Sequence, residues 1–307
     1  MGTGRVFLRL RSWVRCGSRG DDLWGVRCGC CSRMDYGWVR LSISGHHGDS
    51  TSAMNSFRHA GDIGDCLAFL PVIRYFGGGV LYIEAAPYTR QFLTPDKWCG
   101  LDLLLKQQPY IHDVLPWEHQ RVNINGNDFR ANMGRALRKA SLQRNLGDPA
   151  FQKSLVDWQL EAHGVPYTEK DRAWLSVEPD PVAPVVINRT GPGRASHHCY
   201  HNPAFPWHRV WQKYKDKAVF VGLPEEHRVF SAVCGEIPHW PTRDLFHAAR
   251  VIAGASLYIG NQSACFWLAA GMHKRHILEV WPSGPNSLMF YPGSIHGWNV
   301  DVELPNL

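Results

Sequence analysis

The chain has 307 residues, of which 44% are hydrophobic, and it carries a formal net charge of +6. This content suffices for two ordinary globular domains and excludes a disordered or fibrous chain, while no apolar run reaches the roughly 18 residues of a membrane-spanning helix. Eight Arg against four Asp in residues 1–53 account for most of the charge, so the rest of the chain is nearly neutral and nucleic acid is not favoured as a partner.

Residues 1–53 differ in composition from everything that follows. They contain no Lys, Pro or Glu, but they hold four of the nine cysteines. Three interpretations compete: an Arg-rich leader similar to a transit peptide, a zinc cluster, or a mis-assigned start with Met54 as the natural first residue. The zinc cluster is disfavoured because C-x-C-C is not the usual ligand spacing. Its candidate ligands are Cys28, Cys30, Cys31, His46 and His47. We favour the mis-assigned start and expect this segment to be disordered.

The stretch from His59 to Phe76, HAGDIGDCLAFLPVIRYF, predicts the first half of a βαβ unit. A short strand at 55–58 precedes it, and the glycines Gly61 and Gly64 are each followed by an aspartate. Apolar residues at helical spacing come next. Open α/β sheets bind ligands over such a strand-to-helix turn, so Asp62 and Asp65 are candidates for chemistry.

Alternating strands and helices continue after this unit and predict a largely parallel sheet covered on both faces. We expect strands at 80–84, near 114 and at 122–124, and helices at 101–107, 127–143 and 151–163. The densest basic run, 130–144, falls on one of these helices. It predicts a solvated helix face or one that binds an anionic surface.

Three prolines within residues 178–184 predict a semi-rigid linker between two domains. We place an N-terminal domain at 54–181 and a C-terminal domain at 182–307. The second domain repeats the alternation, with strands expected at 185–188, 218–222, 257–260 and 275–280. Its expected helices are 207–214, 225–234, 244–254 and 263–271. The fold class is therefore α/β, with two Rossmann-like domains.

A second chemical stretch runs from Tyr258 to Gly271, YIGNQSACFWLAAG. A buried strand ends in Gly-Asn-Gln, and a helix begins at or next to Ser263. Free backbone N–H groups and the helix dipole make such a start a site for a phosphate or diphosphate, although an ordinary N-cap is the alternative.

Together the two stretches resemble glycosyltransferase family nine, the ADP-heptose:lipopolysaccharide heptosyltransferases. On the first side, Gly64-Asp65 is followed after five residues by Pro71. On the second side, the helix at 244–254 is followed by Tyr258-Ile259-Gly260-Asn261, then Ser263 and Leu268-Ala269-Ala270. Order and spacing agree with the family over roughly residues 54–290.

The resemblance implies a GT-B fold, in which two Rossmann-like domains face each other across a cleft. The first domain would hold the acceptor and the second the nucleotide sugar. It implies an enzyme that transfers a heptose-like or other sugar with inversion and without a metal or cofactor. Asp65 stands at the position of the general base, and Gly61, Asp62 and Gly64 form the acceptor-side turn. A helix N-cap is the alternative role for Asp65.

The donor side departs from the family pattern. Gln262 and Trp267 stand where the family has an acidic residue and a histidine, and a phosphate-binding lysine of the next loop has no counterpart. Arg189 and Arg194 are the candidate substitutes, because a guanidinium matches phosphate oxygens. Glu279 either contacts sugar hydroxyls or is merely exposed. The predicted donor and phosphate site thus comprises Arg189, Arg194, Asn261, Gln262, Ser263, Ala264 and Glu279.

Two other function classes stay open. A non-catalytic descendant that binds a nucleotide sugar or glycan is suggested by the departures at Gln262 and Trp267. An NAD-dependent oxidoreductase requires G-x-G-x-x-G, which Gly61 and Gly64 do not supply. The histidines 197, 198 and 201 are too closely spaced for one metal site.

The remaining predictions concern location and partners. The five scattered cysteines after residue 53 predict a reduced, cytoplasmic protein. We expect a nucleotide-diphosphate sugar and an anionic glycan or other hydroxyl acceptor as partners, with peripheral contact at the inner membrane as a further option. A part in lipopolysaccharide biosynthesis follows from the resemblance alone.

Overall fold

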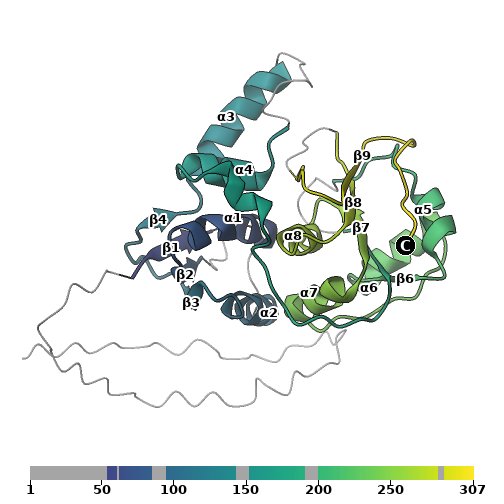
Figure 1. The fold of residues 1–307 in the computed structure, drawn as a ribbon, viewed down its shortest axis with the longest axis horizontal. Helices are drawn as coiled ribbons and strands as arrows, with labels where there is room; N and C mark the ends of the chain where they lie inside the picture. Colours follow the sequence, from purple (N-terminus) through teal and green to yellow (C-terminus); the bar gives the residue numbers. More distant parts are fainter. Residues whose placement is uncertain (1–53, 61, 85–94, 143–151, 191–199, 283–286) are drawn as a thin grey trace, which may run out of the picture. The chain divides into compact units, whose positions relative to one another are not determined.

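The structure, a computed structural model, describes residues 54–60, 62–84, 95–142, 152–190, 200–282 and 287–307. Its first sheet contains four parallel strands in the order β3-β2-β1-β4 (Figure 1). These are β1 (Ser56–His59), β2 (Gly79–Ile83), β3 (Ile111–Pro116) and β4 (Ile124–Asn125). The candidate zinc ligands of residues 1–53, and also Gly61 and Arg194, lie outside the described residues.

In the described part of this half, four α-helices and the short 3-10 helix η2 accompany the sheet. They are α1 (Ile63–Tyr75), α2 (Pro95–Lys106), α3 (Phe129–Leu142), α4 (Leu155–Ala162) and η2 (Tyr167–Asp171). Helix α1 is buried throughout Cys66–Ile73, as expected for a helix that is apolar on all sides. Ser154 and Asp157 form a capping box at the start of α4, which explains why this helix begins after the predicted residue 151.

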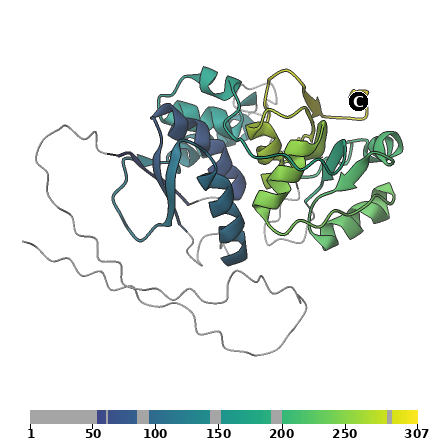
Figure 2. The same cartoon turned by 60° about the horizontal axis from the view of Figure 1, so that its bottom comes forward.

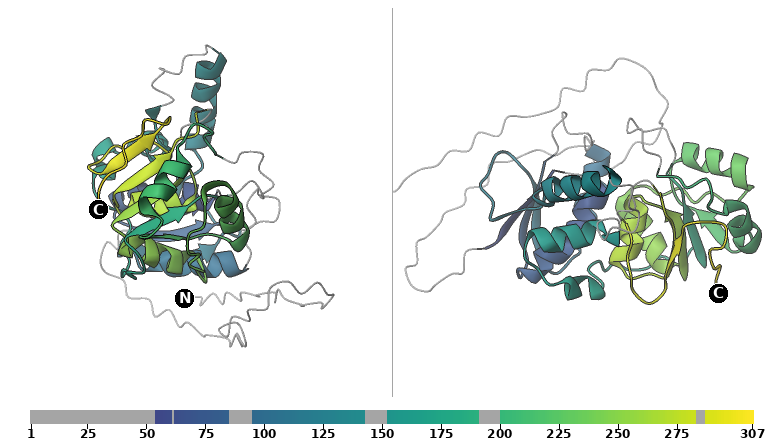
Figure 3. Two further views of the ribbon diagram at one scale, coloured as in Figure 1. Left: turned by 90° about the vertical axis from the view of Figure 1, so that its right-hand side faces the viewer. Right: turned by 90° about the horizontal axis from the view of Figure 1, so that it is seen from above.

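The second sheet has five parallel strands in the order β6-β5-β7-β8-β9. Its strands are β5 (Val185–Asn188), β6 (Ala218–Phe220), β7 (Leu257–Asn261), β8 (His276–Glu279) and β9 (Ser294–Gly297). Its helices are α5 (Trp207–Tyr214), α6 (Pro224–Cys234), α7 (Leu245–Gly254) and α8 (Ala264–Gly271). Figures 2 and 3 show each sheet as a layer with helices packed against it. Among the elements in the described residues, only β9 and η2 have no counterpart among the predicted elements.

Both strand orders belong to doubly wound α/β folds. The order 3-2-1-4 is part of the Rossmann order, and the second sheet follows the flavodoxin-like order 2-1-3-4-5. The prediction of two Rossmann-like α/β halves is thus confirmed, and this is the organisation that the GT-B resemblance implies. In such sheets ligands bind at the carboxyl ends of the strands where the order reverses. These switch points lie between β1 and β4 and between β5 and β7.

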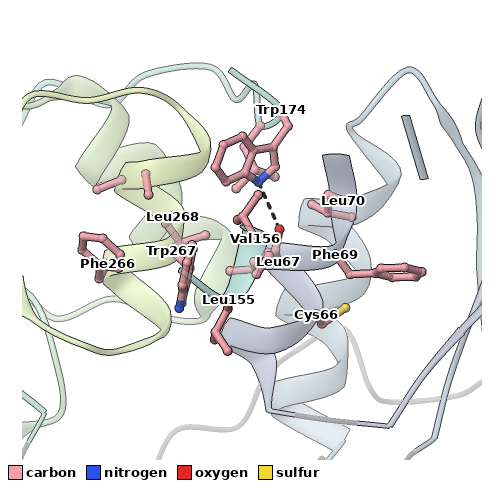
Figure 4. Packing of buried hydrophobic residues seen from close by; sticks show 14 of the residues in the cluster. Cys66, Leu67, Phe69, Leu70, Leu155, Val156, Trp174, Phe266, Trp267 and Leu268 are labelled. Carbon is pink, nitrogen blue, oxygen red and sulfur yellow. Dashed lines mark hydrogen bonds between the residues drawn. The ribbon is translucent and has the colours of Figure 1, made fainter. Parts of the chain in front are cut away.

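Helix α1 packs against α8, and α2 packs against α7. Pro71 lies inside α1 and has no N–H, so it leaves the carbonyl of Leu67 without its helical donor. The indole Nε1–H of Trp174 donates to this carbonyl at 3.0 Å (Figure 4). The backbone N–H of Trp174 donates in turn to the carbonyl of Gly271 in α8. Trp174 therefore ties α1 to α8.

The predicted linker, residues 178–184, is neither helix nor strand in the structure. It lies along α7, because Asp180 N–H donates to the Arg250 carbonyl at 2.9 Å and Arg250 Nε donates to the Glu178 carbonyl at 3.1 Å. The predicted boundary between residues 181 and 182 falls in this segment. Of the helices in the described ranges, none combines the length and apolar character that crossing a membrane requires.

Candidate functional site

The first switch point brings together an acidic and a basic side chain. Asp65 lies in the first turn of α1, which follows β1, and Arg130 lies in the first turn of α3, which follows β4. Strands β1 and β4 are hydrogen-bonded neighbours. Arg130 Nη2 donates to Asp65 Oδ2 at 2.5 Å. The Asp65 side chain is 18% exposed and that of Arg130 is 45% exposed.

The electrostatic setting of Asp65 suits proton transfer near neutral pH. Burial raises the pKa of Asp65 to about 7; Arg130 opposes this shift, and Asp62 at the N-cap position of α1 adds to it. A carboxyl group with such a pKa exchanges its proton readily at neutral pH, which is the property of a general base or acid. Burial keeps the neighbouring groups neutral, since it lowers the pKa of His59 to about 3 and raises that of the Cys66 thiol to about 12.

Gly64 lets the second half of the chain approach this turn closely. A Cβ atom at residue 64 would lie 2.7 Å from Cδ1 of Trp267, so only glycine leaves room for the indole. Trp267 belongs to α8 and is buried between α8 and α1 (Figure 4). Sequence reasoning marked Trp267 only as a departure from a family histidine. The structure shows that it packs against the turn that carries Asp65.

The second switch point lies at the carboxyl ends of β5, β7 and β8. Asn188, Asn261 and Glu279 end these strands, and Asn261 pairs in register with Glu279. Asn261 Oδ1 accepts from the Thr190 N–H at 3.0 Å, which fixes the chain that leaves β5. Asn188 Nδ2 donates to the Val221 carbonyl at 2.8 Å, which links β5 to the end of β6. Short polar side chains therefore hold this edge of the sheet together.

Arg189 and Glu279 form a two-point ion pair. Arg189 Nε and Nη2 donate to Oε2 and Oε1 of Glu279, each at 3.0 Å. Glu279 is fully buried, and Oε1 also accepts from the Asn202 N–H at 2.8 Å. The predicted alternative, an exposed Glu279, is therefore wrong. The carboxylate can be buried because Arg189 and the Asn202 N–H compensate the loss of its contact with water. The Arg189 guanidinium, predicted to hold phosphate, already has a carboxylate partner.

The start of α8 is a capped helix N-terminus. Ser263 is the N-cap residue: its Oγ accepts from the Phe266 N–H and donates to Asn188 Oδ1 at 2.9 Å. Ala264 is the first residue of the helix. Gln262 is buried, and its Oε1 accepts from the Trp281 N–H at 2.9 Å. The first N–H groups of a helix have no partner within the helix, so this end can hold an anion as well as a cap.

The structure thus gathers five of the predicted donor-site residues with Glu279 at one sheet edge: Arg189, Asn261, Gln262, Ser263 and Ala264. Asp62, Gly64 and Asp65 lie together at the other switch point. His201 belongs to the second site, where its Nε2 lies 2.8 Å from the Thr190 carbonyl and burial lowers its pKa. No group of three or more potential metal ligands occurs in the described part of the chain.

Sequence reasoning missed one residue of the first site, Arg130. It was included only in a basic helix expected to be solvated or to bind an anionic surface. Its place in the first turn of the helix after a strand was the available signal, because that position lies at the carboxyl edge of the sheet. Which strand lies beside β1 is a tertiary fact that the sequence pattern does not contain.

No protein-family model matches the sequence, and no curated protein matches it. Among solved structures, the chain is similar to a family 9 glycosyl transferase from Veillonella parvula, with 11% identity over 80% of this chain and 85% of that one and a TM-score of 0.46. It is also similar to the E. coli heptosyltransferase WaaC solved with ADP, with 12% identity, 79% and 92% coverage and a TM-score of 0.48. A third is the iron-containing dodecameric glycosyltransferase TibC from enterotoxigenic E. coli, with 16% identity, 78% and 61% coverage and a TM-score of 0.46. All three of these solved structures are glycosyltransferases.

Proposed function

We propose that the protein is an inverting glycosyltransferase that moves a sugar from a nucleotide-diphosphate donor to a hydroxyl group of a glycan or other acceptor. The observation that carries the proposal is the setting of Asp65. Its carboxyl has a pKa of about 7 and lies at the first switch point. The preceding residue, Gly64, packs against Trp267, about one helical turn from the N-terminus of α8.

In the proposed reaction Asp65 acts as the general base. The carboxylate takes the proton of the acceptor hydroxyl while the hydroxyl oxygen bonds to the anomeric carbon of the donor. The bond between that carbon and the diphosphate oxygen breaks, and its electron pair leaves with the diphosphate. The N–H groups of Ser263 and Ala264 at the start of α8 compensate the departing charge. This step uses no metal ion and no cofactor.

The donor is proposed on the resemblance and on the second switch point. The resemblance implies a heptose-like sugar on ADP, but Gln262 and Trp267 replace two residues of the family pattern. The sugar and base of the donor are therefore distinguished by the nucleotide screen described below. A cytoplasmic location and peripheral membrane contact stay predictions, as does an anionic acceptor.

The Arg189–Glu279 pair favours a second candidate, a non-catalytic protein that binds a nucleotide sugar. A guanidinium whose Nε and Nη2 both donate to a buried carboxylate has less capacity for phosphate than a free one. A protein of this class would bind nucleotide without turning it over. Both candidates therefore bind a nucleotide sugar, but only the glycosyltransferase releases nucleoside diphosphate from it.

A thermal-shift screen with ADP, GDP and UDP, and with sugars attached to each, tests the donor site. A nucleotide at 100 times its dissociation constant is expected to stabilise the fold by about 2.7 kcal/mol. Adenosine, which lacks the diphosphate, is the matched control and is expected to shift the melting temperature less than ADP. If no nucleotide shifts the melting temperature of the folded protein, both candidates fail.

A further inference from the structure

Arg130 is held in place by the loop between β4 and α3. The Gly126 N–H donates to the Arg58 carbonyl at 2.7 Å, and the Ala60 N–H donates to Asn127 Oδ1 at 3.3 Å. Both bonds tie the start of α3 to the end of β1. Phe129, the first residue of α3, is fully buried. These contacts fix the first turn of α3 relative to β1, and with it the backbone of Arg130 next to Asp65.

The other basic residues of α3 that the structure describes behave differently. Arg135 is exposed and donates to Asn132 Oδ1 at 2.5 Å within its own helix. Lys139 is exposed near the end of the helix. Of these three residues, Arg130 alone contacts Asp65. This contact follows from the place of Arg130 at the start of α3 and not from the density of basic residues along the helix.

We propose that Arg130 is the positioning residue for the Asp65 carboxylate, an inference that rests on Asp65 acting as the general base. Arg130 donates to Oδ2 and so leaves Oδ1 to receive the proton of the acceptor hydroxyl. Its positive charge favours the ionised carboxylate in a place where burial favours the protonated acid. A base that is buried enough to be reactive thereby remains able to accept a proton at neutral pH.

Few other charges act on Asp65. On its own helix Asp62 opposes Arg130, and α8, which packs against α1, has no charged side chain. His59 at the end of β1 is neutral, because burial lowers its pKa to about 3. On α4 and η2, which also pack against α1, the charged or titratable side chains are Asp157, Glu161, Tyr167, Glu169, Lys170 and Asp171, with His163 and Arg172 at the ends of these helices. Of these, Asp157 pairs with Lys170, and Glu169 pairs with Arg172 and with Arg74 of α1 itself. Arg130 is therefore the cation whose removal should change the titration of Asp65 most.

The test compares Arg130→Gln, Arg130→Lys and the matched control Arg135→Gln with the wild type. The carboxyl carbon of Asp65, labelled with 13C and identified by its loss in Asp65→Asn, is titrated by NMR without substrate. Arg130→Gln is expected to raise the Asp65 pKa by about one pH unit or more, since a neighbouring opposite charge shifts a carboxyl by that amount. Arg130→Lys is expected to restore most of the wild-type value, and Arg135→Gln to leave it unchanged.

Turnover gives the second measurement, as release of nucleoside diphosphate from ADP-, GDP- and UDP-sugars across pH, with the sugar transferred to an added lipopolysaccharide-type glycan or to water. In Arg130→Gln the acidic limb of the plot of kcat against pH is expected to move to higher pH by the same amount as the Asp65 pKa, with KM unchanged. An unchanged Asp65 titration in Arg130→Gln overturns the inference, as does a rise in KM with an unmoved pH profile, which would make Arg130 a substrate ligand. Should Arg130→Gln fail to fold, the neutral variant Arg130→Met is titrated in its place: a raised Asp65 pKa supports the inference, and a wild-type Asp65 pKa overturns it. Wild-type turnover by Asp65→Asn would instead refute the proposed function, whatever the titration shows.

Discussion

Two carboxylates, Asp65 and Glu279, lie at the carboxyl ends of the two sheets in different surroundings. Glu279 is fully buried and its oxygens accept from two nitrogens of Arg189 and from one backbone N–H. Asp65 is partly exposed and meets one nitrogen of an Arg130 that is itself half exposed. The compensated setting of Glu279 suits a structural role, whereas the single contact and raised pKa of Asp65 suit the proton transfer that we propose. The sequence pattern singled out both residues but not these opposite settings, because their partners come from distant parts of the chain.

Glu279→Gln tests the structural role at this scale. The substitution leaves the Arg189 guanidinium largely buried without a counter-charge, so the free energy of unfolding is expected to fall by about 3–5 kcal/mol. Urea unfolding followed by circular dichroism measures the loss. Glu225→Gln, in an exposed pair with Arg228, is the control and is expected to unfold at the wild-type urea concentration. Equal stability of the two variants would contradict a structural role for Glu279.

Helices α1 and α8 are the elements that bring the two halves together. Trp174 satisfies the carbonyl that Pro71 leaves open in α1, and its backbone N–H bonds to the end of α8. Trp267 fills the space beside Gly64 at the other end of the contact. Pro71 and Gly64 thus have structural roles in the contact with α8, in addition to marking the family-like motif. The α8 helix itself was predictable from its apolar sequence, but its packing partner was not.

Gly64→Ala, made in the wild type and in Trp267→Ala, tests this contact. In the wild type the new methyl group would overlap Trp267, so a loss of about 1–3 kcal/mol in unfolding free energy is expected. In Trp267→Ala the space is open, and alanine is expected to be neutral or to stabilise α1 by up to about 1 kcal/mol, because glycine is the poorer helix former. Chemical unfolding of the four proteins gives the coupling. The same loss in both backgrounds would show that Trp267 does not occupy this space.

At the scale of the whole molecule, two Rossmann-like sheets each place a polar cluster at a switch point. Alternating strands and helices predicted both sheets, and β5 and α5 were predicted with the bounds that the structure has. The edge strand β9 was not predicted, because Ser294–Gly297 contains a single apolar side chain, Ile295, and is flanked by Gly293 and ended by Gly297. Its pairing with β8 supplies the structure that local sequence does not. Of the site, the motifs predicted Asp65 and the turn before α8, while Arg130 and the Arg189–Glu279 pair depend on tertiary packing.

The central claim, that Asp65 is the base of a glycosyl transfer, is tested most directly by nucleoside diphosphate release in wild type, Asp65→Asn and the control Asp62→Asn. Nucleotide binding is followed in parallel by thermal shift. The expected result is a fall in kcat of at least about 100-fold in Asp65→Asn, because general bases contribute 10²–10⁴ in rate. Binding should be unchanged, and Asp62→Asn should keep most of its turnover. Wild-type turnover by Asp65→Asn would contradict the claim, and nucleotide binding without turnover in any of the three proteins would identify a binding protein instead.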